Sequence, residues 1–323
     1  GNHAQGVALA AQQLGLSATV FMPEGAPIPK EKATRGYGAD VVFEGRYLED
    51  ALVAARRFAE ETGAVLIHPF DHADVVAGQG TVGLEILEQA PDTQTVLIPA
   101  GGGGLLAGVA IALKAVRPDI TVIGVQAKGA AAYPASLQQG APVALASMKT
   151  MADGIAVGLP GEITFAAVRD HVDDIITVSE EAMSRALLAL VERAKMIVEP
   201  AGAAAVAAML EQPSAFATPA VAVLSGGNID PILLGKVIQH GMAAAGRYLN
   251  LHVTIPDSPG GLARLLGEVG DTGANVLEVV HERISASLHL DEVDVQLQLE
   301  TRGEPHAATV LARLRERGYR VLE

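Results

Sequence analysis

Short apolar runs rich in β-branched residues alternate with longer Ala- and Leu-rich stretches through the first three quarters of the chain. These runs are almost continuously apolar, which is typical of strands buried on both faces of a parallel sheet. They cover residues 18–22, 40–43, 64–67, 95–98, 121–125 and 220–224. Residues 48–62, 104–116 and 179–195 have helical composition, and Ser179 is the expected N-cap of the last of these helices. The sequence therefore predicts an α/β body built on a parallel sheet.

The pattern changes after Leu249. Residues 249–255 alternate apolar with polar side chains, as a half-exposed strand does. The next predicted elements are a turn at 256–261 and a helix with Leu262, Leu265 and Val269 on one face. They are followed by strands at 276–287 and 291–299, a helix through 310–314 and a strand at 319–321. This order predicts a ferredoxin-like βαββαβ domain. We place the domain limits at 1–68, 69–245 and 249–323.

Composition excludes several classes of protein. The net charge of -14 over 323 residues argues against a nucleic-acid or anionic-membrane surface, because such a field repels phosphate. The chain has no Cys, which excludes disulfides and thiolate metal sites and favours a cytoplasmic location. Residues 96–113 are uncharged, but Pro99 and four successive glycines predict strand, loop and helix there rather than a membrane span.

Four successive glycines, Gly101 to Gly104, stand between a predicted strand and a predicted helix. Unpaired backbone N–H groups at such a junction can bind a phosphate, and glycine permits the close approach. A turn that only lets strand and helix pack is the simpler alternative. No Gly-Lys-Ser/Thr ending follows, which excludes a P-loop. A dinucleotide site remains a weak alternative, because the next strand ends in Gln126 rather than in an acidic residue.

Three further segments are candidates for a ligand site. Ser225-Gly226-Gly227-Asn228 follows a predicted strand, at the edge of the sheet where α/β proteins bind ligands, although alone it would suit a surface turn. Asn2 precedes a predicted helix at 3–14 and is either its N-cap or a ligand contact. Glu199 lies next to an apolar helix, where a carboxylate is either paired or functional. His68 and His72 have no third ligand nearby, so we predict a polar loop and no metal site there.

These motifs resemble the pyridoxal-phosphate (PLP) serine/threonine dehydratases, on residues 1–6, 99–105, 198–202 and 225–228. The C-terminal domain resembles an ACT domain, the amino-acid-sensing domain of many metabolic enzymes. The resemblance implies a PLP fold-type II, tryptophan-synthase-β-like body. Residues 1–68 would be the remnant of its small subdomain, 69–245 the large PLP-binding subdomain and 249–323 the ACT regulatory domain. It also implies conversion of L-threonine, and of L-serine, to 2-oxobutanoate or pyruvate and ammonia.

The resemblance also implies residue roles. PLP would be bound by Gly101, Gly102, Gly103, Gly104 and Leu105 at its phosphate, by Ser225 at its ring nitrogen and by Asn2 at its 3-hydroxyl. Glu199 and Asp153 would lie near the ring. The Schiff-base lysine is expected upstream of Gly1, so we assign no catalytic residue within the chain and expect these 323 residues alone to be inactive.

The resemblance further implies the partners. Gln126 stands where related serine racemases carry the Glu that binds a divalent cation, so no metal is expected. Besides the amino-acid substrate, an amino-acid effector is expected at the ACT loop 257–262, and the protein is expected to be a homo-oligomer.

Two other functions remain open. One is a serine racemase or another hydroxy-amino-acid lyase, although Gln126 and the ACT domain count against a racemase. The other is a non-catalytic amino-acid sensor. The sequence upstream of Gly1 would separate them, since a lysine-bearing segment supports an enzyme and a native start supports a sensor.

Overall fold

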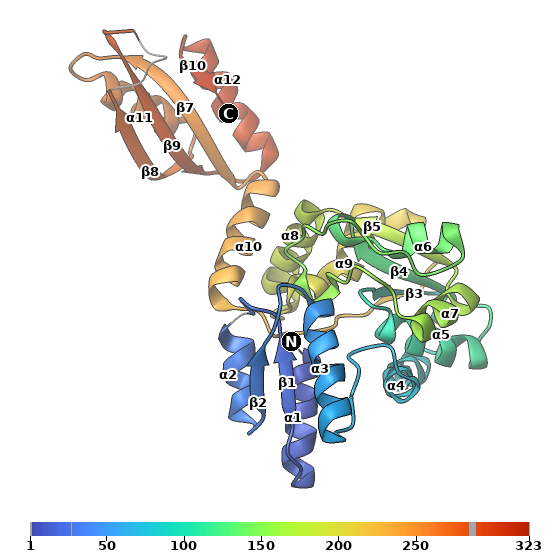
Figure 1. Ribbon diagram of the computed structural model, residues 1–323. Helices are drawn as coiled ribbons and strands as arrows, with labels where there is room; N and C mark the ends of the chain where they lie inside the picture. Colours follow the sequence, from blue (N-terminus) through green and yellow to red (C-terminus); the bar gives the residue numbers. More distant parts are fainter. Residues whose placement is uncertain (1, 27, 284–288, 323) are drawn as a thin grey trace. The chain divides into compact units, whose positions relative to one another are not determined.

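The computed structural model describes residues 2–26, 28–283 and 289–322. Contacts between Cα atoms divide the chain into two compact units, Gly1–Leu234 and Gly235–Glu323, and the division falls inside helix α10 (Pro231–Ala244) (Figure 1). The boundary at 245–249 that we predict from the sequence lies shortly after the end of this helix. None of the described helices combines the length and the apolar character that crossing a membrane would require.

The first part of unit 1 is a small parallel sheet of two strands with three helices. The elements are α1 (Asn2–Leu14), β1 (Thr19–Met22), α2 (Ile28–Gly36), β2 (Asp40–Phe43) and α3 (Leu48–Thr62), and β1 pairs with β2. Val20, Met22 and Val41 form its core together with Ala8. The two strands and the helix at 48–62 confirm the predictions from the sequence.

Two predictions for this region are wrong. The run 64–67 is not a strand, and Val65 and Ile67 keep 83% and 48% of their surface exposed. Apolar β-branched residues become a strand only where another strand supplies backbone partners, and the described residues supply none here. Strand β2 was expected to be buried on both faces, but Val42 and Phe43 are each 38% exposed.

The larger sheet of unit 1 is parallel, as predicted, with the strand order β5-β4-β3-β6. Its strands are β3 (Thr95–Pro99), β4 (Thr121–Ala127), β5 (Asp174–Val178) and β6 (Ala220–Ala222). Strand β5 was not predicted from the sequence, because it begins at Asp174 and Thr177 interrupts its short apolar run. Strand β3 is fully buried, as its continuous apolar sequence predicts.

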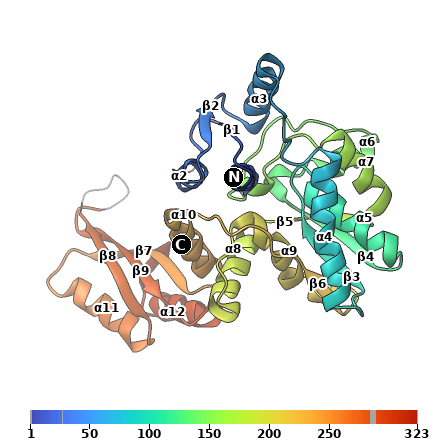
Figure 2. The same ribbon diagram turned by 90° about the horizontal axis from the view of Figure 1, so that it is seen from below.

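Helices cover both faces of this sheet. In both views α4 (Ala73–Gln89), α5 (Gly104–Val116) and α7 (Glu162–His171) lie on one side, and α8 (Glu180–Ala189) and α9 (Pro200–Glu211) lie on the other (Figures 1 and 2). The predicted cap is confirmed, since the Ser179 hydroxyl accepts a hydrogen bond from the Ala182 N–H at the start of α8. The remaining elements are η1 (Lys128–Ala130), α6 (Tyr133–Gln139), η2 (Asp153–Ile155), η3 (Leu190–Ala194) and η4 (Pro213–Ala215).

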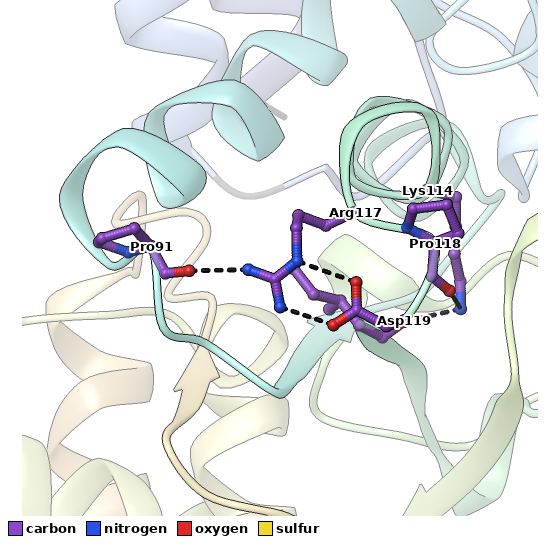
Figure 3. Close-up of polar contacts among 6 residues, drawn as sticks. Pro91, Lys114, Arg117, Pro118 and Asp119 are labelled. Atoms are coloured by element: carbon purple, nitrogen blue, oxygen red, sulfur yellow. Dashed lines mark hydrogen bonds and ion pairs between the residues drawn. The ribbon is translucent and has the colours of Figure 1, made fainter.

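The turn from α5 into β4 is held by charged side chains (Figure 3). The Arg117 guanidinium donates to both carboxylate oxygens of Asp119, at 2.9 and 2.6 Å, and to the carbonyl oxygen of Pro91 at the end of α4. This guanidinium lowers the pKa of Asp119 to about 2. The Lys114 ammonium donates to the carbonyl oxygen of Ile120 at 2.7 Å. These contacts tie the end of α5 to the segment that leads into β4.

Helices α4 and α5 approach closely through glycines. A Cβ at position 83 would lie 2.9 Å from the carbonyl oxygen of Val109. A Cβ at position 108 would overlap the carbonyl oxygen of Val76 and lie 2.8 Å from the Gly80 nitrogen. The backbone of α4 therefore rests directly on α5, the helix that begins at the glycine loop.

We expect Gly108→Ala to lower the free energy of unfolding by about 1–3 kcal/mol, because the new methyl group must push two packed helices apart. Urea denaturation measures the effect. The matched control is Gly78→Ala on α4, where a Cβ meets no atom within 4 Å. Alanine there should raise stability by up to about 1 kcal/mol through helix propensity. Equal effects of the two substitutions would contradict the close approach.

Unit 2 contains a four-stranded antiparallel sheet and two helices. The elements are β7 (Tyr248–Pro256), α11 (Gly261–Asp271), β8 (Asn275–Glu282), β9 (Glu292–Glu300), α12 (Glu304–Glu316) and β10 (Arg320–Leu322), with the strand order β10-β7-β9-β8. Val253, Val295 and Leu297 of the sheet pack against Leu265 of α11 and Val310 of α12. The βαββαβ prediction is confirmed. Of the predicted strand 276–287, residues 284–287 lie outside the described residues.

Candidate functional site

The loop Gly101–Gly104, called the glycine loop below, presents a row of free backbone donors. Strand β3 ends at Pro99, and α5, a helix of 13 residues, begins at Gly104. Among the described residues, no backbone N–H from Gly101 to Leu105 donates to a protein acceptor. Successive free N–H groups at the start of a helix suit an anion, because the helix dipole adds to their partial charges.

The carbonyl groups of the same segment are tied back to the protein. The carbonyl oxygen of Gly102 accepts hydrogen bonds from the Thr164 hydroxyl at 2.7 Å and from the Tyr133 hydroxyl at 3.2 Å. Burial raises the pKa of Tyr133 to about 12, so this hydroxyl remains a donor at neutral pH. The side-chain nitrogen of Gln126 donates to the carbonyl oxygen of Ala100 at 3.2 Å. These anchors hold the loop with its carbonyls engaged and its N–H groups free.

Neighbouring side chains explain why the loop contains only glycine. Gly103 has φ 98°, in the left-handed region, and a Cβ there would overlap the Tyr133 hydroxyl oxygen. A Cβ at position 102 would lie 2.5 Å from ring atoms of Phe70, and one at position 101 would lie 3.0 Å from the Ile155 Cα. A side chain at any of these three positions would therefore collide with the residues that support the loop.

Gln126 has a structural role at this loop that the sequence analysis missed. Its side chain is completely buried, and its oxygen accepts a hydrogen bond from the Tyr133 N–H at 3.0 Å while its nitrogen binds Ala100. It therefore links the end of β4 to the glycine loop and to the start of α6. From the sequence alone, Gln126 indicated only that an acidic ribose ligand and a metal-binding Glu are absent at this position. Within the described part of the chain, no three His, Asp or Glu side chains are grouped to hold a metal.

The polar loop predicted around His68 packs against the glycine loop through Phe70. The His68 Nδ1 atom accepts hydrogen bonds from the Asp71 N–H at 2.8 Å and from the Phe70 N–H at 3.3 Å. The Asp71 carboxylate in turn accepts from the Thr164 and Glu162 N–H groups, each at 3.1 Å, at the start of α7. His68 therefore shapes the turn that presents Phe70 to the glycine loop.

We expect acid to destabilise unit 1 through His68. Burial lowers the pKa of this imidazole below 6.5, so the stability that it contributes is complete above pH 6.5. That stability is lost as the pH falls from 6.5 through the lowered pKa, because the imidazole of the unfolded chain binds a proton at a higher pH than that of the folded chain. The free energy of unfolding, measured at several pH values, should decline less steeply in His68→Asn. The exposed His281→Asn is the matched control, and an equal decline in all three proteins would contradict the assignment.

The structure brings three of the predicted site segments together, Asn2, Glu199 and 225–228. Asn2 lies in the first turn of α1, and its amide contacts distant side chains instead of capping the helix. Its nitrogen donates to the Glu199 Oε1 atom at 3.1 Å, and its oxygen accepts from the Asn228 side chain at 2.6 Å. Ser225, which follows β6, is attached through its N–H to the carbonyl oxygen of Gly202 at 3.4 Å. A Cβ on Gly226 would lie 2.8 Å from the Asn2 nitrogen.

Gly154 connects this cluster to the glycine loop. A Cβ at Gly101 would lie 3.4 Å from the Gly154 carbonyl oxygen, and a Cβ at Gly154 would lie 2.9 Å from the Glu199 Oε1 atom. The cluster around Asn2 and Glu199 therefore lies next to the glycine loop, with Gly154 between them.

Two buried charges of opposite sign lie at this site. Glu199 is 3% exposed, and its Oε2 atom has no hydrogen-bond partner among the described residues. Burial raises the pKa of Glu199, while the positive charge of Lys30 opposes that shift. Lys30 is 7% exposed and is paired with Asp153, with 2.5 Å between Nζ and Oδ2. The sequence gives Lys30 no role, because nothing in its local pattern marks it and its partner Asp153 lies 123 positions away.

Comparison with known proteins agrees with this geometry. A family model described as pyridoxal-phosphate dependent enzyme matches residues 1–226. An L-threonine ammonia-lyase of Geobacter sulfurreducens is 47% identical over 322 residues, which cover 99% of this chain and 80% of the relative. An L-threonine ammonia-lyase of Thermotoga maritima is 44% identical over 321 residues, with the same coverage of 99% and 80%.

Solved structures show the same fold. A threonine deaminase from T.th. is 48% identical with a TM-score of 0.68, covering 71% of this chain and 76% of that one. Maize serine racemase is 37% identical with a TM-score of 0.69, covering 75% of each chain.

The residues at this site fit pyridoxal phosphate. The free N–H row suits its phosphate, and the Asn2 amide and the Ser225 hydroxyl are polar groups of the kind that a pyridine ring with a hydroxyl requires. The chain therefore belongs to the pyridoxal-phosphate-dependent enzymes, in the threonine ammonia-lyase family.

Proposed function

We propose that this chain forms the body of an enzyme that converts L-threonine, and also L-serine, to 2-oxobutanoate or pyruvate with release of ammonia. The main support for this proposal is the glycine loop at the start of α5. The Gly102 carbonyl of this loop is anchored by hydrogen bonds, while the backbone N–H groups of the loop remain available to a phosphate. The two L-threonine ammonia-lyases, which the chain matches over 99% of its length, support the choice of substrate.

Each proposed site residue has a specific task. The N–H groups of Gly101, Gly102, Gly103, Gly104 and Leu105 bind the cofactor phosphate. Asn2 would donate to the oxygen on the ring, and the Ser225 hydroxyl would contact the ring nitrogen. A neutral hydroxyl in place of a carboxylate leaves that nitrogen largely unprotonated, which suits the loss of a β-hydroxyl group. The bound cofactor supplies the electron sink for removal of the α-proton.

The lysine that attaches the cofactor is proposed to precede Gly1 in the natural protein. Lys30, which is buried in the same cluster, is paired with Asp153 and is not our candidate. On this proposal, residues 1–323 alone bind the cofactor weakly and do not turn over threonine. The cytoplasmic location also remains a prediction.

The test measures 2-oxobutanoate release from L-threonine with added pyridoxal phosphate. The protein in its natural full length is compared with residues 1–323. We expect activity only in the full-length protein. D-serine formation from L-serine without release of 2-oxobutanoate would favour a racemase, and amino-acid binding without any turnover would favour a sensor. Turnover by residues 1–323 alone would contradict the upstream lysine.

We also propose that unit 2 binds an amino-acid effector. A cavity of about 630 Å³ lies at the predicted loop 257–262, where Gly260 with φ 80° precedes α11. Arg283 borders this cavity and pairs with Asp257 at 3.2 Å, so its guanidinium is placed near an incoming carboxylate. An amino acid that changes the threonine KM should lose that effect in Arg283→Gln. The homo-oligomeric state remains a prediction.

A further inference from the structure

The Asn2 amide is held at both ends by side chains from distant parts of unit 1. Its nitrogen donates to Glu199, 197 positions away, and its oxygen accepts from Asn228, 226 positions away. The second of these bonds is short, at 2.6 Å. Asn2 and Asn228 are both exposed, so the bond between them is not a by-product of core packing.

The chemistry of the partners determines which way the amide points. An ionised carboxylate only accepts hydrogen bonds, so the Asn2 nitrogen must face Glu199. Asn228 donates through its own nitrogen, so it must meet the Asn2 oxygen. An amide nitrogen carries two hydrogens, and Glu199 uses one of them. The second hydrogen remains for a bound group, and its direction is set because the amide is planar.

Glu199 is suited to remain an acceptor. Its carboxylate fits between Gly154 and Gly226, where a Cβ on either residue would collide with its Oε1 atom. Burial raises the pKa of Glu199, and the nearby charge of Lys30 together with the Asn2 hydrogen bond favours the ionised form. The glycine of the Ser225-Gly226 turn thus allows Glu199, Asn2 and the segment after β6 to meet.

We propose that Glu199 and Asn228 are positioning residues, which together orient the Asn2 amide so that its free hydrogen points at an oxygen of the cofactor ring. This inference rests on the proposed function, because it assumes that the site binds pyridoxal phosphate. Glu199 and Asn228 act through Asn2 and do not themselves contact the cofactor oxygen. Removing either one leaves Asn2 in place but free to rotate.

A double-mutant cycle tests this dependence. The dissociation constant of pyridoxal phosphate is measured by fluorescence titration for the full-length protein and for Asn2→Ala, Asn228→Ala and the double variant. We expect each single substitution to weaken binding about fivefold to tenfold, as loss of one hydrogen bond does. The double variant should bind no more weakly than Asn2→Ala, because Asn228 has nothing left to orient. Both residues are exposed, so folding should be unaffected.

Glu199 is tested by conservative rescue. Glu199→Ala should weaken binding as much as Asn2→Ala does, while Glu199→Gln keeps an acceptor oxygen and should recover most of the affinity. Glu211→Gln, at the other end of α9, is the matched control and should bind like the wild type. The visible absorption band of the bound cofactor provides a second readout, which should shift in the same way for Asn2→Ala and Asn228→Ala.

The outcomes separate this inference from the proposed function. The positioning role would be overturned if the double variant lost affinity by the product of the two single losses, or if Asn228→Ala bound pyridoxal phosphate as tightly as the wild type. The proposed function would still stand in both cases. Failure of the wild-type full-length protein to bind pyridoxal phosphate would overturn the proposed function itself.

Discussion

Gly103→Ala should weaken binding of pyridoxal phosphate by about a hundredfold, equivalent to about 2.7 kcal/mol, and should abolish threonine turnover. Gly103 has φ 98°, and its added methyl group would overlap the Tyr133 hydroxyl and lie 3.1 Å from the Thr164 Cβ. These are the two side chains that anchor the Gly102 carbonyl. Strain and collision together would turn the free N–H groups away from the phosphate. Fluorescence titration and the 2-oxobutanoate assay measure the effect.

Gly140→Ala is the matched control. Gly140 also has a positive φ, 76°, but a Cβ there meets no atom within 4 Å. The variant therefore carries the backbone strain without the collision, and should lose stability while keeping its affinity for the cofactor. If Gly103→Ala bound the cofactor as tightly as Gly140→Ala does, the glycine loop would not be the phosphate cradle.

Gln126→Glu should lower the free energy of unfolding by about 3 kcal/mol or more, and should impair cofactor binding as well. The new carboxylate has nearly the same shape, but it cannot donate to the Ala100 carbonyl oxygen and would repel it. It would also place a negative charge at a position with 0% exposure, without a counter-charge among its present partners, Ala100 and Tyr133. Urea denaturation at neutral pH measures the loss.

The control for this substitution is Gln138→Glu on α6, which makes the same chemical change on an exposed side chain. We expect less than about 0.5 kcal/mol of change there. The loss in Gln126→Glu should shrink at acidic pH, where the carboxyl group is protonated and can donate again. A pH-independent loss would point to packing rather than to charge.

Much of the fold follows from local patterns in the chain. The positions of β3 and β4, the helices at 48–62 and 104–116, and the βαββαβ order of unit 2 agree with the sequence. Burial on two faces leaves a continuous apolar run and burial on one face leaves a period, and both can be recognised along a short segment. The run 64–67 was wrongly predicted to be a strand, because whether an apolar segment becomes a strand depends on a neighbouring strand that lies elsewhere in the sequence. Strand β5 was not predicted, because its apolar run is short and contains polar residues.

The sequence by itself determined the α/β class and the glycine loop between strand and helix, because each depends on residue types at short spacing. Only the tertiary structure decided how these parts act together. It placed Asn2 between Glu199 and Asn228, and it put Gln126 behind the glycine loop. It also buried Lys30 against Asp153. Most of these contacts join residues far apart in the chain, so their geometry exists only once the sheet and its helices have packed.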